Sequence, residues 1–340
     1  MNLADLMERF STVDAARDYL EKQRWPDGPE CPHCGLVGEA YKITPKPIPP
    51  VTEYESKSEL KAKRVRKPRR GLWKCAGCRK PFTVTVGTIF EDSHIPLNKW
   101  VIAVHLLCAS KKGMSAHQLH RMLGVTYKSA WFMAHRIRYG MSQEPLASQL
   151  NGVVEADETY VGGRRRDRGH AIKVGQRQQD RPAPMAGKEA VFSVLQRGGR
   201  VRSTHIDRVI GSTLRAALNE LCTPDAHIIT DEAAYYKGLK HDGRKHSSVN
   251  HRAKEYVRWD DGVCITTNTI EGFFSILKRG INGTYHHVSK QHLHRYLSEF
   301  DFRFNAREMS DSDRREAALK GFGGKRLMLH DPIGKIEKSS

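Results

Sequence analysis

The sequence predicts a multidomain α+β protein, in which small N-terminal modules precede a larger mixed α/β domain. Three observations support this fold class: two C-x-x-C pairs near the start, two adjacent helical patterns after them, and a second half that alternates between strand-like and helix-like segments. With 340 residues, the chain is long enough for two or three domains that each have a core.

The chain is strongly basic, with a formal net charge of +19 and a pI of about 9.7. Such a charge indicates a polyanionic partner but says nothing about the fold. A ribosomal protein or a protein of the membrane surface would share it. No apolar run approaches the length of a transmembrane helix, and the first residues lack the basic-then-apolar order of a signal peptide. We therefore expect a cytoplasmic protein without a membrane partner.

The first 28 residues form a helical segment. Apolar residues recur at helical spacing over residues 3–24, and either Ser11 or Thr12 is suited to cap the second part of that pattern. Residues 25–28 (Trp-Pro-Asp-Gly) then predict a turn that ends the helix.

Four of the seven cysteines form the two C-x-x-C pairs, Cys31 with Cys34 and Cys75 with Cys78. Short strands are predicted around the second pair, at residues 71–74 and 81–84. Two such pairs on tight turns supply four thiolates to one tetrahedral Zn²⁺, so we predict a structural zinc ribbon rather than free thiols or a redox pair. The basic stretch at about 41–70 is interpreted as a flexible insertion.

The other three cysteines (Cys108, Cys222 and Cys264) are interpreted as ordinary core residues. Beyond the ribbon, the pattern over residues 97–138 is helical. A short helix, a turn at Gly124 and a second helix from Thr126 predict a helix-turn-helix, although a plain helical hairpin has the same pattern. If the second helix enters a major groove, four side chains on it are candidates for DNA contact: Tyr127, Lys128, Arg136 and Arg138.

The second half predicts strands at about 152–161, 190–195, 201–206 and 227–230, with helices at 213–221 and from 268. Residues 247–250 are a weaker candidate for a strand. This order is that of a mixed α/β domain rather than a doubly wound one. Residues 164–188 are basic and lack periodicity, so we expect a loop near nucleic acid that includes Arg164, Arg165 and Arg166.

The last of these helices carries a distinctive pattern. Asn268 is predicted to cap it, and Glu271 to complete a capping box. Ile270, Phe274 and Leu277 form an apolar stripe, whereas Glu271 and Lys278 share another face. An ordinary capped amphipathic helix would look the same.

Three carboxylates stand at positions where strand ends and a helix start can meet: Asp157, Asp231 and Glu271. Like charges placed close together are costly unless a cation neutralises them. Oxygen-only ligands select Mg²⁺ or Mn²⁺, and two such ions about 4 Å apart would assist phosphodiester cleavage. For any one of these acids, a solvated or ion-paired side chain is the simpler interpretation.

The sequence resembles the DDE-type insertion-sequence transposases that carry an N-terminal zinc ribbon, the ISXO-like group. The resemblance runs from about residue 10 to about residue 305. It is carried by both C-x-x-C pairs and by residues 84–93, 118–125, 155–163, 230–232, 249–251, 268–274, 283–289 and 299–305.

The resemblance implies a ribonuclease-H-like catalytic domain with two Mg²⁺ or Mn²⁺ ions and a triad of Asp157, Asp231 and Glu271. Asn268 is an alternative for the third position, but a carboxylate binds Mg²⁺ better than an amide does. The resemblance also implies that Lys278 lies near a terminal phosphate, and Arg279 follows it on the DNA-facing side.

On this basis we expect a zinc ribbon over 29–93, a helix-turn-helix region over 94–145, a catalytic domain over 150–310 and a C-terminal tail over 311–340. The expected function is binding of terminal inverted repeats, 3′-end cleavage and strand transfer into target DNA, by a homo-oligomer that pairs two ends in the bacterial cytoplasm at the nucleoid. A non-catalytic DNA-binding regulator is the alternative, and a nuclease that cuts without joining is a third.

Overall fold

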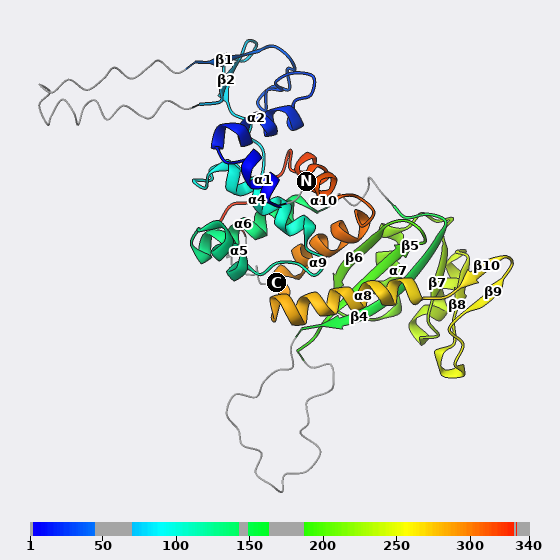
Figure 1. Cartoon of the computed structure of the whole chain (residues 1–340). Coiled ribbons are helices and arrows are strands. Elements are labelled where there is room, and N and C mark those ends of the chain that lie inside the picture. The colour runs from blue at the N-terminus through cyan, green and yellow to red at the C-terminus, as the bar shows by residue number, and fades with distance from the viewer. Residues whose placement is uncertain (1–2, 45–69, 143–148, 163–186, 330, 332–340) are drawn as a thin grey trace, which may run out of the picture. The chain divides into compact units, whose positions relative to one another are not determined.

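The computed structural model describes residues 3–44, 70–142, 149–162, 187–329 and 331 (Figure 1). The chain divides into two compact units. The ribbon unit holds residues 1–105 and 315–327, and the sheet unit holds residues 106–314 and 328–340. In the described part of the chain, no helix is both long and apolar enough to cross a membrane.

The start of the ribbon unit is helical, as predicted, with α1 (Leu3–Arg9) and α2 (Val13–Arg24). Thr12 is the N-cap of α2, and its side chain accepts a hydrogen bond from the Ala15 N–H at 3.1 Å. The stretch predicted to be a C-terminal tail contains a helix, α10 (Asp311–Lys320). Its fully buried Arg315 donates from Nε to the Tyr19 hydroxyl at 3.3 Å, which packs α10 against α2.

A three-stranded antiparallel sheet of order β1-β2-β3 completes the ribbon unit; its strands are β1 (Ala40–Ile43), β2 (Leu72–Cys75) and β3 (Pro81–Phe82). The two strands predicted around the second cysteine pair are confirmed as β2 and β3. The insertion predicted from about residue 41 starts too early, because Tyr41 to Ile43 pair with β2. The rest of that insertion, residues 45–69, lies outside the described residues.

Three helices follow: α4 (Leu97–Ala109), α5 (Ala116–Leu123) and α6 (Tyr127–Gly140). Ser115 caps α5 and Thr126 caps α6, each through its side-chain oxygen. Gly124 ends α5 in the left-handed conformation, at φ 58°, where glycine is least strained. Two helices and a short turn are therefore present at the place the sequence predicted.

The sheet unit is built on five strands in the order β6-β5-β4-β7-β8. β4 pairs antiparallel with β5 and β5 with β6, whereas β4 pairs parallel with β7 and β7 with β8. The bounds are β4 (Val153–Val161), β5 (Glu189–Gln196), β6 (Val201–Ile206), β7 (His227–Thr230) and β8 (His246–Ser248). The predicted mixed α/β arrangement is confirmed.

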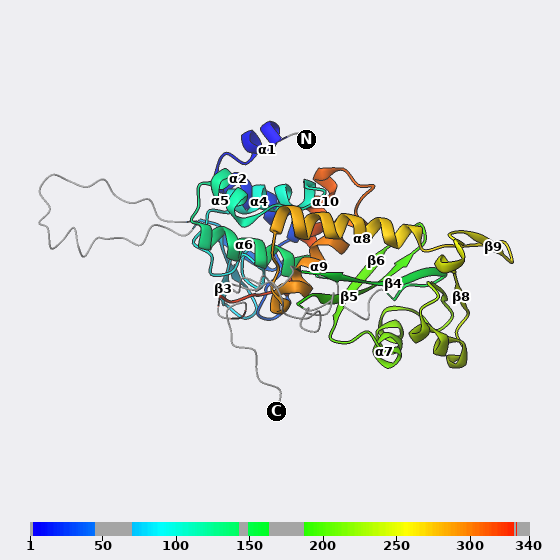
Figure 2. The same cartoon turned by 90° about the horizontal axis from the view of Figure 1, so that it is seen from below.

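Helices cover both faces of this sheet (Figure 2). On one face, α7 (Gly211–Leu221) packs over a core that includes Val154, Phe192 and Leu218. On the other face, α8 (Asn268–Gly280) and α9 (Lys290–Asn305) pack over Val191 and Leu195. The predicted apolar stripe of α8 is buried, together with Phe273. The central strands of the sheet therefore lie between two layers of helices.

Short elements join β7 to α8. They are the 3₁₀ helices η3 (Ala234–Asp242) and η4 (His251–Ala253), and the antiparallel hairpin of β9 (Arg258–Asp260) and β10 (Val263–Ile265). A π-helical turn, η5 (Ile281–Tyr285), follows α8. The sequence analysis did not predict the hairpin.

Candidate functional site

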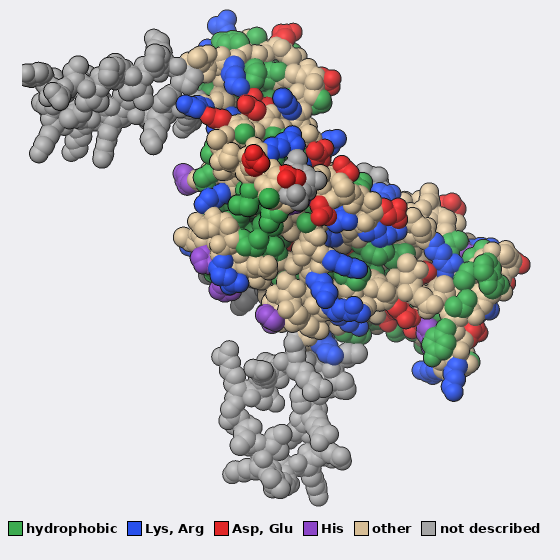
Figure 3. Space-filling model, in the orientation of Figure 1, with side chains coloured by type: hydrophobic (Ala, Val, Ile, Leu, Met, Phe, Trp, Pro, Cys, Tyr) green, Lys and Arg blue, Asp and Glu red, His purple; other side chains and the backbone are tan. Residues whose placement is uncertain are grey.

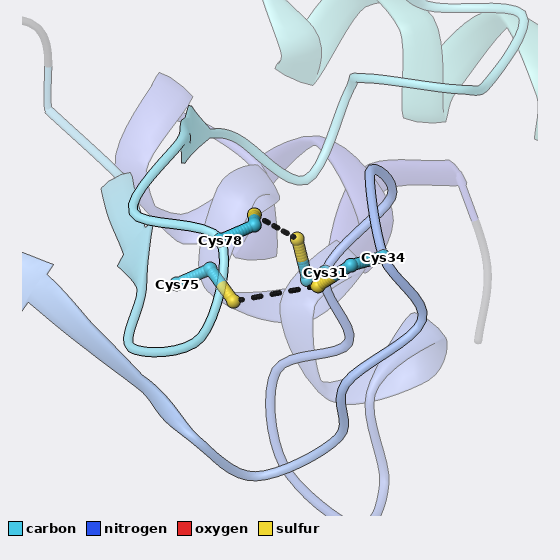
Figure 4. Close-up of side chains that lie close together, drawn as sticks. All are labelled: Cys31, Cys34, Cys75 and Cys78. Carbon is cyan, nitrogen blue, oxygen red and sulfur yellow. Dashed lines mark hydrogen bonds between the residues drawn. The ribbon is translucent and has the colours of Figure 1, made fainter.

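The four cysteines of the two C-x-x-C pairs converge in the ribbon unit (Figure 4). The Sγ atoms of Cys31 and Cys78 are 3.6 Å apart, as are those of Cys34 and Cys75, and all four lie within 4.8 Å of one another. A tetrahedral Zn²⁺ with Zn–S bonds of about 2.3 Å requires sulfur atoms about 3.8 Å apart. The thiols therefore fit a structural zinc ion, as predicted.

The remaining cysteines lie elsewhere. Cys108 and Cys222 are fully buried, as expected of core residues, whereas Cys264 is half-buried. Burial raises the pKa of the Cys222 thiol to about 12, which keeps it protonated and unreactive.

Two of the three predicted acids lie on neighbouring parallel strands. β4 and β7 pair in parallel as far as Glu155 beside Ile229. Asp157 lies two residues further along β4, and Asp231 lies two residues beyond Ile229. Asp231 directly follows the last residue of β7, so its side chain lies at the carboxyl end of that strand. Its Oδ1 accepts a hydrogen bond from the Ala233 N–H at 3.0 Å, and Asp157 Oδ1 accepts one from the Glu158 N–H at 2.7 Å.

The three acids affect one another electrostatically. Burial raises the pKa of Asp157 to about 8, and the nearby charges of Glu158, Asp231 and Glu271 contribute. Burial also raises the pKa of Asp231, with further contributions from Glu232 and Glu271. Among the described residues, however, the four cysteines are the one group of three or more potential ligands within 4.8 Å of one another. In the described part of the chain, the three carboxylates therefore do not form a comparably close group.

Glu271 lies in the first turn of α8 and is half-exposed. Its Oε1 accepts a hydrogen bond from the Thr267 hydroxyl at 3.0 Å and lies 3.6 Å from Nε2 of His251. The predicted capping box is wrong, because Asn268 is already the first helical residue and Thr267, at the N-cap, makes no side-chain cap. The carboxylate of Glu271 is thus not engaged with the backbone N–H groups.

A different carboxylate caps α8. Oε2 of the fully buried Glu155 accepts hydrogen bonds from the backbone N–H groups of Thr269 and Ile270, each at 3.0 Å. Oε1 of Glu155 is 3.1 Å from Nε of Arg197. Sequence analysis missed this role, because a cap contributed by a distant strand has no local signature.

Glu158 is a second acid that sequence analysis missed. Its carboxylate accepts hydrogen bonds from the hydroxyls of Tyr235 and Tyr236, the latter at 2.6 Å. Burial raises the pKa of Glu158, and the charge of Asp231 adds to the effect. Its position next to Asp157 in the sequence was the available signal.

The predicted DNA contacts on α6 divide into two groups. Tyr127 and Lys128, at the start of the helix, are exposed, and the Tyr127 ring stacks on that of His117. Arg136 and Arg138 are buried, at 3% and 2% exposure, so the prediction that they contact DNA is wrong for this structure. Arg138 has structural contacts in the interior. Its Nε donates a hydrogen bond to Glu299 at 2.6 Å, and its guanidinium lies over the Tyr296 ring.

The remaining basic candidates belong to α8 and to the loop after β4. Lys278 and Arg279 are exposed on α8. Arg164, Arg165 and Arg166 lie outside the described residues.

The hairpin of β9 and β10 presents an apolar surface. Trp259 is 73% exposed, and Tyr256 and Val257 beside it are also exposed. In Figure 3, apolar side chains gather over these two strands, with basic side chains nearby. The turn is Asp261-Gly262, both with positive φ, and this Asp-Gly pair directly before the apolar run Val263–Ile265 was the signal for a hairpin.

Comparisons with known proteins agree with this architecture. Residues 149–305 match the family model of the ISXO2-like transposase domain, and residues 11–81 match that of the transposase zinc-ribbon domain. A relative described as an uncharacterized protein in transposable element ISH50 of Halobacterium salinarum is 26% identical over 303 residues, which cover 87% of this chain and 92% of that protein.

Two solved structures are distantly similar. The Mos1 strand transfer complex is 11% identical with a TM-score of 0.27, covering 64% of this chain and 73% of that one. A pre-cleavage Mos1 transpososome is 10% identical with a TM-score of 0.21, covering 64% and 76%. TM-scores this low do not establish a shared fold. The two family matches are specific: the chain joins a transposase zinc-ribbon domain to an ISXO2-like transposase domain. Its resemblance to the ISXO-like insertion-sequence transposases is thereby confirmed.

Proposed function

We propose that the protein is an active transposase that binds the terminal inverted repeats of its insertion sequence, cleaves their 3′ ends and transfers them into target DNA. The observation that carries the proposal is the arrangement of Asp157, Asp231 and Glu271, which come from two neighbouring parallel strands and a helix start. Burial raises the pKa of Asp157 and of Asp231, and the charge of Glu271 adds to both shifts. A protein that only binds DNA gains nothing from placing repelling carboxylates where phosphates must approach.

The sheet supports a ribonuclease-H-like assignment for the catalytic domain, proposed over 150–310. Its three antiparallel strands are followed by two parallel ones, with helices on both faces. We further propose that α5 and α6 are a DNA-binding helix-turn-helix within the region 94–145. Tyr127 and Lys128, at the exposed start of α6, are its candidates for groove contacts.

The three carboxylates fit a pair of Mg²⁺ or Mn²⁺ ions. They supply oxygen ligands alone. Burial raises the pKa of Asp157 to about 8, and the charges of neighbouring acids add to the effect, so a bound cation would favour the ionised carboxylate. Two ions bound there would supply Lewis-acid activation of the attacking oxygen and stabilise the departing one. Asn268, exposed at the first position of α8, is the proposed alternative for the third position.

The chain's own residues would position the DNA. Lys278 and Arg279 lie two turns further along α8 than Glu271, so their charges would hold phosphates beside the reacting bond. Hydrolysis of a phosphodiester first frees a 3′-hydroxyl, and that hydroxyl then displaces a 3′-oxygen of the target strand. Pairing of two ends requires a homo-oligomer, which is part of the proposal, as is action at the nucleoid of a bacterial cell.

The test uses the full chain, its element's terminal repeats and Mg²⁺. Asp157→Asn should abolish nicking and joining while DNA binding in a gel shift is retained, because a neutral amide binds Mg²⁺ much more weakly than a carboxylate does. Asp225→Asn is the matched control, since Asp225 is an exposed acid that precedes the opposite end of β7. Full activity of Asp157→Asn would refute the proposal.

The same assay distinguishes the alternatives. Binding without cleavage under any divalent ion, by the unchanged protein, would indicate a non-catalytic regulator. Cleavage without strand transfer would indicate a simple nuclease.

A further inference from the structure

Glu155 is fully buried on the same strand and the same face as Asp157, yet the proposed chemistry gives it no task. We propose that Glu155 and Arg197 together are positioning residues. They fix the position of Glu271 relative to Asp157 so that the carboxylates bind a divalent cation. This inference rests on the proposed function and concerns how its site is assembled.

The first step is the contact between Glu155 and α8. Its Oε2 receives the N–H groups of Thr269 and Ile270, two of the unpaired donors at the helix start. The residue at the N-cap, Thr267, makes no side-chain cap of its own. The start of α8 is therefore held by β4, and Glu271 is the residue immediately after the second of these donors.

The second step is the contact between Arg197 and the chain that leads into α8. Besides its Nε contact with Glu155, Arg197 donates to the carbonyl oxygen of Cys264 and, at 3.0 Å, to that of Thr266. Arg197 thus holds the end of β10 and the residues directly before the helix. One buried carboxylate and one guanidinium together define where α8 begins.

These contacts set the position of Glu271 relative to Asp157. Residues two apart on a strand are separated by about 6.6 Å, so Glu155 and Asp157 are in a fixed relation. Slippage of α8 by one residue would move Glu271 by about 1.5 Å along the axis and about 100° around it. Contacts of this supporting kind typically change metal affinity by about 10–100-fold when they are removed.

A charged pair is not needed merely to stabilise the sheet unit. Replacement of a buried ion pair by apolar residues of similar size is often neutral or stabilising. Ile229, Val249 and Ile265 already form an apolar cluster, and Ile265 ends the strand that leads into α8. Position 155 instead requires a side chain with two acceptor oxygens. One oxygen accepts from the start of α8, and the other accepts from Arg197.

The experiment measures Mn²⁺ binding to the full, zinc-loaded chain, from the electron paramagnetic resonance signal of free Mn²⁺. Glu155→Gln keeps an acceptor of similar size but loses the charge that pairs with Arg197, and Arg197→Met removes the other partner. Each should weaken Mn²⁺ binding by about 10–100-fold. The double variant should bind Mn²⁺ no more weakly than the single variant with the lower affinity, because both changes disrupt the same contact network.

Asp301→Asn is the matched control for a merely structural effect. Asp301 is also a buried carboxylate, and it joins α9 to β6 by accepting hydrogen bonds from N–H and Oγ of Ser203, each at 2.7 Å. Its substitution should change the melting temperature and leave Mn²⁺ affinity unchanged. An equal loss of Mn²⁺ affinity in Asp301→Asn would overturn the positioning role.

Asp157→Asn separates the two possible failures. If Asp157→Asn binds Mn²⁺ as the unchanged chain does, the proposed function fails. If Asp157→Asn loses binding while Glu155→Gln retains it in full, only the positioning inference fails. Should Glu155→Gln not fold, Arg197→Lys carries the test: it keeps a charge but not the forked donors, so it should bind Mn²⁺ more tightly than Arg197→Met, and equal affinities would refute the inference.

Discussion

The four-cysteine site and the three-carboxylate site differ in how complete they are without an ion. The cysteine sulfur atoms lie within 4.8 Å of one another, at distances a zinc ion requires. The carboxylates come from adjacent strands and a helix start, and they do not form so close a group. Burial raises the pKa of Asp157 to about 8, and the charges of its neighbours add to this shift. Neutral thiols approach one another at little cost, whereas ionised carboxylates repel.

This difference matches the expected tasks. A closed set of four thiolates is suited to hold a folded module together and leaves no position for a substrate. A looser set of oxygen ligands on neighbouring elements is suited to admit both an ion and a phosphate.

Loss of one thiol should have the largest effect. Structural zinc contributes about 10–16 kcal/mol of apparent binding free energy to small zinc modules, and Cys75→Ser leaves three thiolates. We expect the variant to lose its zinc and the hydrogen-exchange protection of β2 and β3, measured by mass spectrometry. Cys264→Ser, at a half-buried site in the other unit, is the control. A Cys75→Ser protein with one bound zinc and full protection would contradict the prediction.

Glu299 is a carboxylate that the chain itself neutralises. Burial opposes its charge, but Arg303 and Arg138 lower its pKa, and the Tyr285 hydroxyl donates to it at 2.7 Å. Glu299→Gln should reduce the free energy of unfolding by about 3–5 kcal/mol, because buried guanidinium groups lose their counter-charge. Urea unfolding measures the loss. Exposed Glu308→Gln is the control, and a loss at Glu299 no larger than at Glu308 would count against the prediction.

Asp301 provides a pH-dependent comparison away from any predicted ligand. Burial raises the pKa of Asp301 to about 7, although the hydrogen bonds from Ser203 favour the charged form and lower the pKa. The folded state therefore keeps a proton that the unfolded state releases near pH 4, and the stabilisation is complete below that pH and lost as the pH rises through about 7.

The free energy of unfolding should accordingly fall between about pH 5 and pH 8, and Asp301→Asn should reduce that fall. Urea titrations of both proteins at the two pH values, without divalent ions, measure the difference. An unchanged fall in Asp301→Asn would show that another group is responsible.

Trp259 should have the smallest effect on stability. Because its side chain is 73% exposed, Trp259→Ser should change the free energy of unfolding by no more than about 0.5 kcal/mol. Phe192→Ser, in the fully buried core of the same unit, should prevent stable folding. A large loss in Trp259→Ser would mean that the hairpin surface is packed in solution, which differential scanning calorimetry would detect.

The sequence by itself determined the features that depend on local pattern. Two C-x-x-C pairs predict a zinc site, because each pair is a turn that presents two thiols. The helical periodicity of residues 268–280 predicts the buried stripe of α8. Such features follow from residues a few positions apart, whose geometry is that of one turn or one element.

Which charged side chains are buried depends on the tertiary structure. The same holds for the partners that these side chains contact. Glu155 caps α8 across 114 residues of sequence, and Arg138 pairs with Glu299 across 161. In the sequence, Asn268 looked like the cap and Arg138 like a DNA contact. A side chain satisfies its hydrogen bonds with whichever partner the fold brings near, and burial, which sets the cost of leaving a charge unpaired, is a property of the packed layers.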